Sequence, residues 1–252
     1  MKKIKEYYEA LEQNRIKAYY QPQFSADSRE VVSAEALCRM VLKDGSVVMP
    51  GKFIQKLEYT GEICSLDWLM VKKACGILSE MRCRGVPLRR VAVNFSRRHV
   101  EEWDAAERLC GLVDLYALKH ELIEIEITET CQIHDFLLVD MIKRIRKEGF
   151  PVAVDDFGRG SSSLGFIREN SFDALKIDKT FLCTEEDDEK TRILLEGIIR
   201  IADKLGVRIV AEGVESREQA DFLKNCGCNI LQGDYLSGPL TEHQYLELLG
   251  RQ

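Results

Sequence analysis

The sequence predicts an α/β fold, a TIM-type (β/α)8 barrel whose first strand runs antiparallel to the second. Short apolar runs with strand character recur eight times along the 252 residues. Between most of them, apolar residues repeat with the 3.6-residue period of helices, and such alternation is typical of a parallel barrel. The first two runs are separated by about ten residues, too few for a helical crossover, so they should pair antiparallel. The expected strands are Ile16–Gln21, Val31–Leu37, Val91–Phe95, Ile123–Thr128, Val152–Asp155, Ala174–Ile177, Arg208–Ala211 and Ile230–Gln232.

The helices are predicted from apolar periodicity and from residues that favour helix ends. Acidic residues in a first turn and a Ser or Thr before it favour a helix start, and Gly favours an end. The expected helices are an amphipathic segment over 1–14, one capped by Ser65 that runs to Gly85, one from Phe136 to about Gly149, one opened by Thr184 that stops at Gly206, and one opened by a capping box of Ser216 and Gln219.

Composition limits the classes of protein and partner. No linker, low-complexity tract or internal repeat divides the chain, so we expect a single domain over 1–252, with a helix over 1–14 and the barrel over 15–252. A net charge of −6 argues against a nucleic-acid polymer as partner. No apolar run is long enough for a membrane segment, and the N-terminus lacks a signal-peptide core, which indicates a cytoplasmic protein. Nine irregularly spaced cysteines indicate reduced thiols and disfavour a structural zinc site.

Polar side chains stand at the C-terminal ends of almost all the expected strands, where barrels of this class carry their chemistry. A single carboxylate there is usually a helix cap or a solvated loop residue. Many carboxylates at one rim would repel one another, and some would be protonated unless cations were present. The residues are Glu35, Asn94, Glu126, Glu129, Asp155, Asp156, Lys176, Glu212, Glu215 and Gln232.

Hard oxygen ligands of this kind suit Mg²⁺ or Mn²⁺ better than zinc. Several carboxylates and one amide oxygen are enough for two ions that share a bridging aspartate, and a two-metal site favours cleavage of a phosphate ester. Lys176 is the residue in this set that can orient the attacking water or stabilise charge in the transition state. Asp155 and Asp156 can both face metal if the strand ends there and the backbone turns.

A series of motifs, in this order and spacing, resembles the EAL domain family, the metal-dependent phosphodiesterases of bacterial cyclic-di-GMP signalling. The motifs are YYQP, AEALCRM, FIQKLEYTGEI, VAVNFS, IEITET, DDFGRGSSSL, FDALKID, VAEGVE and LQG. The resemblance covers about Tyr19 to Pro239 and implies a barrel with an antiparallel first strand. It also implies hydrolysis of cyclic-di-GMP to linear pGpG and assembly into a homodimer.

The resemblance also implies roles for individual residues. One metal ion has Glu35, Asn94, Glu126 and Asp155 as ligands, and the second has Asp155, Asp156 and Glu212. Lys176, Glu212 and Glu129 form the catalytic set, in which Lys176 holds the nucleophilic water and Glu129 steadies the loop after Asp156. The residues expected to line the dinucleotide are Gln21, Leu37, Arg39, Glu215 and Gln232.

Some positions depart from the family pattern, but none of them is a predicted metal ligand. Arg159 and Ser161 change the loop after the paired aspartates, and Met40 stands where a tryptophan is usual. Two alternatives therefore stay open. Besides a cyclic-di-GMP phosphodiesterase, the chain is either a catalytically weak or inactive EAL domain that binds cyclic-di-GMP or a protein partner, or a barrel hydrolase for another phosphate ester.

Overall fold

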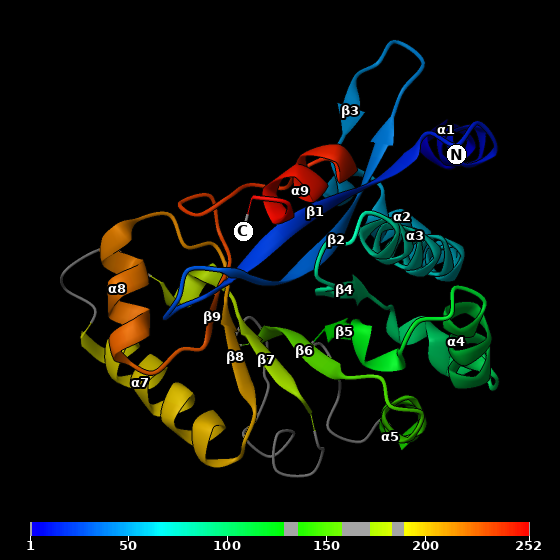
Figure 1. Ribbon diagram of the computed structural model, residues 1–252. Helices are drawn as coiled ribbons and strands as arrows, with labels where there is room; N and C mark the ends of the chain where they lie inside the picture. The colour runs from blue at the N-terminus through cyan, green and yellow to red at the C-terminus, as the bar shows by residue number, and fades with distance from the viewer. Residues whose placement is uncertain (1, 129–135, 158–171, 183–188, 252) are drawn as a thin grey trace.

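The computed structural model describes residues 2–128, 136–157, 172–182 and 189–251. Eight strands close into a barrel with helices around it, which confirms the predicted fold class (Figure 1). Helices α3 (Ile63–Cys83), α4 (Ala105–Asp114) and α5 (Phe136–Lys147) lie on one side of the barrel, and α7 (Glu189–Lys204) and α8 (Arg217–Asn225) lie on the other. The barrel strands are β1 (Ile16–Ser25), β2 (Val31–Val41), β4 (Arg90–Asn94), β5 (Ile123–Thr128), β6 (Val152–Phe157), β7 (Ala174–Ile177), β8 (Arg208–Ala211) and β9 (Ile230–Leu231).

The antiparallel first strand is confirmed. β1 pairs with β2 in a register that runs from Ile16 opposite Met40 to Phe24 opposite Val31. At its other edge β1 meets β9, also antiparallel, through Phe24 opposite Leu231, and this pairing closes the barrel. The remaining neighbours in the barrel are parallel. A short strand that the sequence did not predict, β3 (Val47–Val48), extends β2 as a hairpin.

One predicted helix start is corrected, and the structure adds three helices that the sequence did not predict, α2 (Ile54–Thr60), α4 (Ala105–Asp114) and α9 (Glu242–Leu249). α3 begins at Ile63, not at a Ser65 cap, because α2 ends at the left-handed Gly61 and the chain re-enters a helix almost at once. Thr184 lies outside the described residues, while the capping box of Ser216 and Gln219 is confirmed. The helices are α1 (Lys2–Glu12), α2 (Ile54–Thr60), α3 (Ile63–Cys83), α4 (Ala105–Asp114), α5 (Phe136–Lys147), α7 (Glu189–Lys204), α8 (Arg217–Asn225) and α9 (Glu242–Leu249).

Alternation along the strands separates the apolar core from the polar barrel interior. On β5 the outward residues Ile123, Ile125 and Ile127 are buried in the main apolar core, while Glu124 and Glu126 lie on the opposite, inward face. On three other strands a fully buried alanine precedes the inward polar residue by two positions: Ala92 before Asn94, Ala153 before Asp155 and Ala174 before Lys176. Small side chains therefore form the layer below the polar rim.

Helix length and composition also bear on the membrane. Among the described helices, none is both long and apolar enough to cross a bilayer.

Candidate active site

Four carboxylates converge on the ammonium group of Lys176, which is buried in the barrel. Nζ of Lys176 lies 2.7 Å from both Glu126 Oε2 and Glu212 Oε1. It lies 3.2 Å from Glu35 Oε2 and 3.3 Å from Asp155 Oδ1. These side chains come from, or directly follow, β2, β5, β6, β7 and β8, at the rim where the parallel strands end. The structure therefore brings together five of the polar residues that the sequence places at this rim, namely Glu35, Glu126, Asp155, Lys176 and Glu212.

The cluster carries more negative than positive charge in a buried setting, and the pKa values of its groups reflect this. Burial raises the pKa of Glu126 well above its ordinary value, and burial raises that of Glu212 to about 8 against the pull of Lys176. Burial likewise raises the pKa of Asp155. For Lys176, burial alone would lower the pKa, but Asp155, Glu126, Glu212 and Glu35 together hold it well above its usual value.

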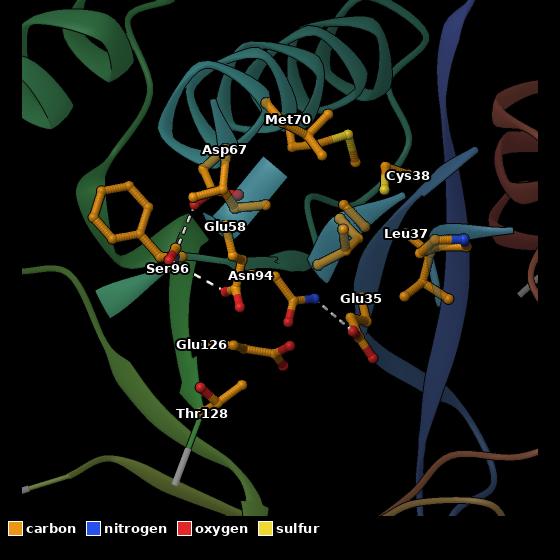
Figure 2. Close-up of a pocket in the computed structure, with 16 residues that line it drawn as sticks. Glu35, Leu37, Cys38, Glu58, Asp67, Met70, Asn94, Ser96, Glu126 and Thr128 are labelled. Atoms are coloured by element: carbon orange, nitrogen blue, oxygen red, sulfur yellow. Dashed lines mark hydrogen bonds between the residues drawn. The ribbon is translucent and has the colours of Figure 1, made fainter. Parts of the chain in front are cut away.

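Glu35 differs from the other carboxylates because amide groups stabilise its charge. Its Oε1 accepts a hydrogen bond from Asn94 Nδ2 at 2.9 Å (Figure 2). Its Oε2 accepts one from Gln232 Nε2 at 2.8 Å. Burial opposes the charge, but Lys176 and these two amides leave the pKa of Glu35 below its ordinary value. Gln232 Nε2 also donates to Gln21 Oε1 at 3.2 Å, so Gln21 joins the same network.

A bulge in β6 explains how two consecutive aspartates occupy the rim. The pairing of β6 with β7 shifts register between Val154 and Phe157. Asp156 has a φ of 56°, an uncommon conformation for a residue other than glycine, and its backbone N–H donates to Asp155 Oδ1 at 2.8 Å. The expectation that the strand ends at Asp155 is therefore corrected: the strand continues to Phe157 through the bulge, which interrupts the alternation of faces.

The donor set fits hard divalent cations. Glu35, Glu126, Asp155 and Glu212 offer carboxylate oxygens, and Asn94, opposite Glu126 in the strand register, offers an amide oxygen. Among the described residues, Oε1 of Glu126 is a buried oxygen without any hydrogen-bond partner. Such an orphaned oxygen in an anionic cluster needs a cation or a proton.

The predicted substrate-lining residues divide into two groups. Gln21 and Gln232 belong to the network, and Leu37 lines a pocket of about 270 Å³ beside Glu35, Asn94 and Glu126 (Figure 2). In the described part of the chain, no hydrogen bond joins Arg39 or Glu215 to this network. The Arg39 guanidinium donates to the Cys38 carbonyl and lies 5.7 Å from the centre of the Tyr19 ring, and the exposed Glu215 donates its backbone N–H to Gln219. Glu129, Arg159 and Ser161 lie outside the described residues.

The structure adds polar residues that sequence reasoning missed. Gln23 and Ser33 are buried behind Gln232: Ser33 Oγ donates to Gln23 Oε1 at 2.6 Å, and Gln23 Nε2 donates to Gln232 Oε1 at 2.8 Å. The period of two that places Gln21 inward also places Gln23 there, so this residue was detectable. Glu58 and Asp67 line the pocket from the helices (Figure 2).

Comparison with known proteins identifies the family. The model of the EAL domain matches residues 4–239. The chain belongs to the EAL domain family. The signaling protein YkoW of Bacillus subtilis is 32% identical over 245 residues, which are 97% of this chain and 30% of that protein. The cyclic di-GMP phosphodiesterase NbdA of Pseudomonas aeruginosa is 30% identical over 233 residues, which are 92% of this chain and 30% of that protein.

The fold of a solved EAL structure agrees with that of this chain. The PaMucR phosphodiesterase in complex with c-di-GMP superposes with a TM-score of 0.90 at 27% identity, over 97% of this chain and 100% of that one. This chain spans only 30% of the length of the two relatives above. Members of the EAL family are cyclic-di-GMP phosphodiesterases and are generally metal-dependent, so the resemblance seen in the motifs is confirmed at the level of the family.

Proposed function

We propose that this EAL domain hydrolyses cyclic-di-GMP to linear pGpG with two divalent cations, Mg²⁺ or Mn²⁺. The observation that carries the proposal is the convergence of four carboxylates, one of them with an orphaned buried oxygen, on a single buried lysine. A purely structural ion cluster would balance its charges. This one has an excess of oxygen donors beside a pocket of about 270 Å³.

The residues divide the work between cation binding and proton control. Glu35, Asn94, Glu126 and Asp155 would hold one ion, and Asp155, Asp156 and Glu212 the other. When bound, two such ions would lower the pKa of a water molecule and would stabilise the negative charge of a phosphodiester displacement. Lys176 keeps its proton because its pKa is held well above the ordinary value by the surrounding carboxylates, although burial opposes this. It therefore acts as a donor that orients water and stabilises negative charge, not as a general base.

The substrate would lie across the rim between these residues and the pocket. Leu37 and the apolar wall of the pocket suit the flat face of a guanine base, and Gln21 and Gln232 present amides beside Glu35. Arg39 would pair with a phosphate oxygen. Water adds across one of the two phosphodiester bonds, that P–O bond breaks, and the ring opens to pGpG. We also propose that the domain is cytoplasmic. We propose further that it acts as a homodimer, and light scattering on the purified chain tests this oligomeric state.

The first experiment follows pGpG by chromatography after incubation of the protein with cyclic-di-GMP and Mg²⁺ or Mn²⁺, with EDTA as the control. We expect metal-dependent product, and we expect Lys176→Ala to lower turnover by about 100-fold or more at saturating metal. Calorimetric binding of cyclic-di-GMP without product would instead identify a binding module. Turnover of bis(p-nitrophenyl) phosphate but not of cyclic-di-GMP would indicate a hydrolase for another ester.

A further inference from the structure

Cys64, His99 and Glu102 form a second group of ligand-type side chains, distinct from the carboxylate cluster. One ligand atom from each lies within 4.8 Å of the others. Cys64 is in the first turn of α3, His99 is in the 3-10 helix η2 (Arg97–Glu101), and Glu102 directly follows it. The spacing of three residues brings His99 and Glu102 together, while Cys64 reaches them from a different helix.

The imidazole of His99 is held between two carboxylates. Its Nε2 lies 3.2 Å from Asp67 Oδ2, and its Nδ1 lies 3.1 Å from Glu102 Oε2. A neutral imidazole has one N–H donor only. If Nε2 donates to Asp67, the lone pair of Nδ1 points at an anionic oxygen of Glu102. A second ring proton, a proton on one of the two carboxyl groups or a metal ion bound to Nδ1 would each remove this conflict.

The surroundings favour a metal ion because they hold the side chains of His99 and Glu102 in fixed orientations before an ion binds. Phe95 stacks on the His99 ring with centroids 3.6 Å apart, and Trp68 meets the ring edge-on at 5.2 Å. Trp68 Nε1 donates to Glu102 Oε2 at 3.0 Å, which orients that carboxylate. A histidine that donates its remote N–H to a carboxylate, here Asp67, is the usual support for a metal-ligating imidazole.

We propose that Cys64, His99 and Glu102 bind a zinc ion. One thiolate, one imidazole and one carboxylate are a donor set that zinc accepts, and three protein ligands leave a fourth position for water. Mg²⁺ and Mn²⁺ prefer the all-oxygen set of the barrel rim, so the two sites differ in the metal they select. The side chain of Glu102 is 27% exposed and that of Cys64 is half-buried, which gives an ion a path from solvent.

The zinc site would also steady the rim of the barrel. Asp67 Oδ2, which faces His99, accepts a hydrogen bond from the backbone N–H of Ser96 at 2.7 Å (Figure 2). Ser96 follows β4 and lies two residues after Asn94, a predicted ligand of the catalytic metal. Zinc on His99 would therefore hold Asp67 and the loop that leaves β4 in one position.

Cobalt is the probe that distinguishes this site from the carboxylate cluster. Purified full chain, stripped of metal with EDTA and supplied with excess Mg²⁺ to saturate the oxygen ligands, is titrated with Co²⁺. We expect the near-ultraviolet charge-transfer band of a cobalt–thiolate bond, with a stoichiometry of one ion, and loss of that band when Zn²⁺ is added. Absence of the band in the wild-type chain overturns the proposal.

Paired cysteine variants assign the sulfur. Cys64→Ser should abolish the band, whereas Cys83→Ser, which changes an exposed cysteine on the same helix, should leave it intact. Glu102→Gln should weaken Co²⁺ binding by about 10-fold or more. A band that persists in Cys64→Ser places the ion at another cysteine and overturns the proposal. As a check that does not depend on colour, Zn²⁺ should raise the Tm of the wild type and of Cys83→Ser but not that of Cys64→Ser.

Discussion

Glu124 and Glu126 stand two residues apart on the inward face of β5, and both are almost fully buried, yet their surroundings are opposite. Glu124 Oε2 accepts hydrogen bonds from two arginines, Arg90 at 3.2 Å and Arg208. Glu126 shares one lysine with three other carboxylates and keeps one oxygen without a partner among the described residues. We call the part of the barrel around Glu124 the lower end and the rim around Glu126 and Lys176 the upper end. The lower end therefore has more positive charge than its carboxylate requires, and the upper end has less positive charge than its carboxylates require.

The difference separates stability from function. At the lower end the chain itself supplies enough positive charge to neutralise its buried carboxylate, so this contact holds the barrel together and needs nothing from solution. At the upper end the chain supplies oxygen donors without enough positive charge, and such an arrangement is costly unless a cation binds. The imbalance of the upper end is thus the feature that a metal-dependent site requires.

The largest effect is expected from Glu126→Gln. We expect phosphodiesterase turnover to fall by about 1,000-fold or more, because Glu126 is a proposed ligand of an ion that would stabilise several kcal/mol of transition-state charge. The free energy of unfolding in EDTA should change by less than about 1 kcal/mol, because burial raises the pKa of Glu126 and makes its charge costly, so that a neutral amide of the same shape is tolerated there. Steady-state kinetics and urea denaturation measure the two quantities. Full Mn²⁺-dependent turnover in this variant would contradict the assignment.

Glu124→Gln is the matched change at the lower end. It should lower the free energy of unfolding and leave the turnover almost unchanged. It leaves Arg90 and Arg208 without their shared carboxylate, and we expect a loss of about 1–3 kcal/mol in the free energy of unfolding. The arginine side chains are 31% and 30% exposed, so solvent moderates the loss. Turnover per folded molecule should stay within about 2-fold of the wild type. A large loss of turnover with unchanged stability would mean that the two ends are not independent.

The sequence predicts the residues of the upper end well because the position of each one follows from the pattern of its own strand. Strand runs and their period of two place Glu35, Asn94, Asp155 and Lys176 at one rim, and the motif resemblance agrees. Contacts across the barrel were not predictable in this way. Ser33 and Gln23 support Gln232 from strands far away in sequence, and Asp67 meets His99 across two helices. The bulge at Asp156 was also missed, because the strand pattern does not mark a residue other than glycine for a positive φ.

The response of stability to metal should depend on pH at the upper end. Because the pKa of Glu212 rises from its ordinary 4.5 to about 8 in the fold, the folded protein holds a proton that the unfolded chain releases between these values. The contribution of Glu212 to stability in EDTA is therefore fully present below its ordinary pKa and is lost as the pH rises through this window. Burial of Asp155 acts in the same direction. The rise in Tm caused by Mn²⁺ should grow from about pH 5 to about pH 8, and a flat or falling response would contradict a charge-deficient site.

The smallest effect is expected from Asp173→Asn at the lower end. Asp173 precedes β7, and its two oxygens accept from Arg146 Nε at 3.0 Å and Nη2 at 3.1 Å, with a further bond from the Val152 N–H at 2.9 Å. Burial opposes its charge, but these donors leave its pKa below the ordinary value. The stability that it contributes is therefore present above the ordinary pKa and is lost as the pH falls through the lowered one.

For Asp173→Asn we expect a loss of about 1 kcal/mol in the free energy of unfolding near neutral pH, measured by urea denaturation, because the pair is half-exposed. The exposed Asp203→Asn on α7 serves as the control and should change this free energy by less than about 0.5 kcal/mol. Mn²⁺ should raise the Tm of Asp173→Asn as much as that of the wild type. If the variant instead lost its response to Mn²⁺, the lower end would take part in metal binding, and the separation between a balanced end and a metal-dependent end would fail.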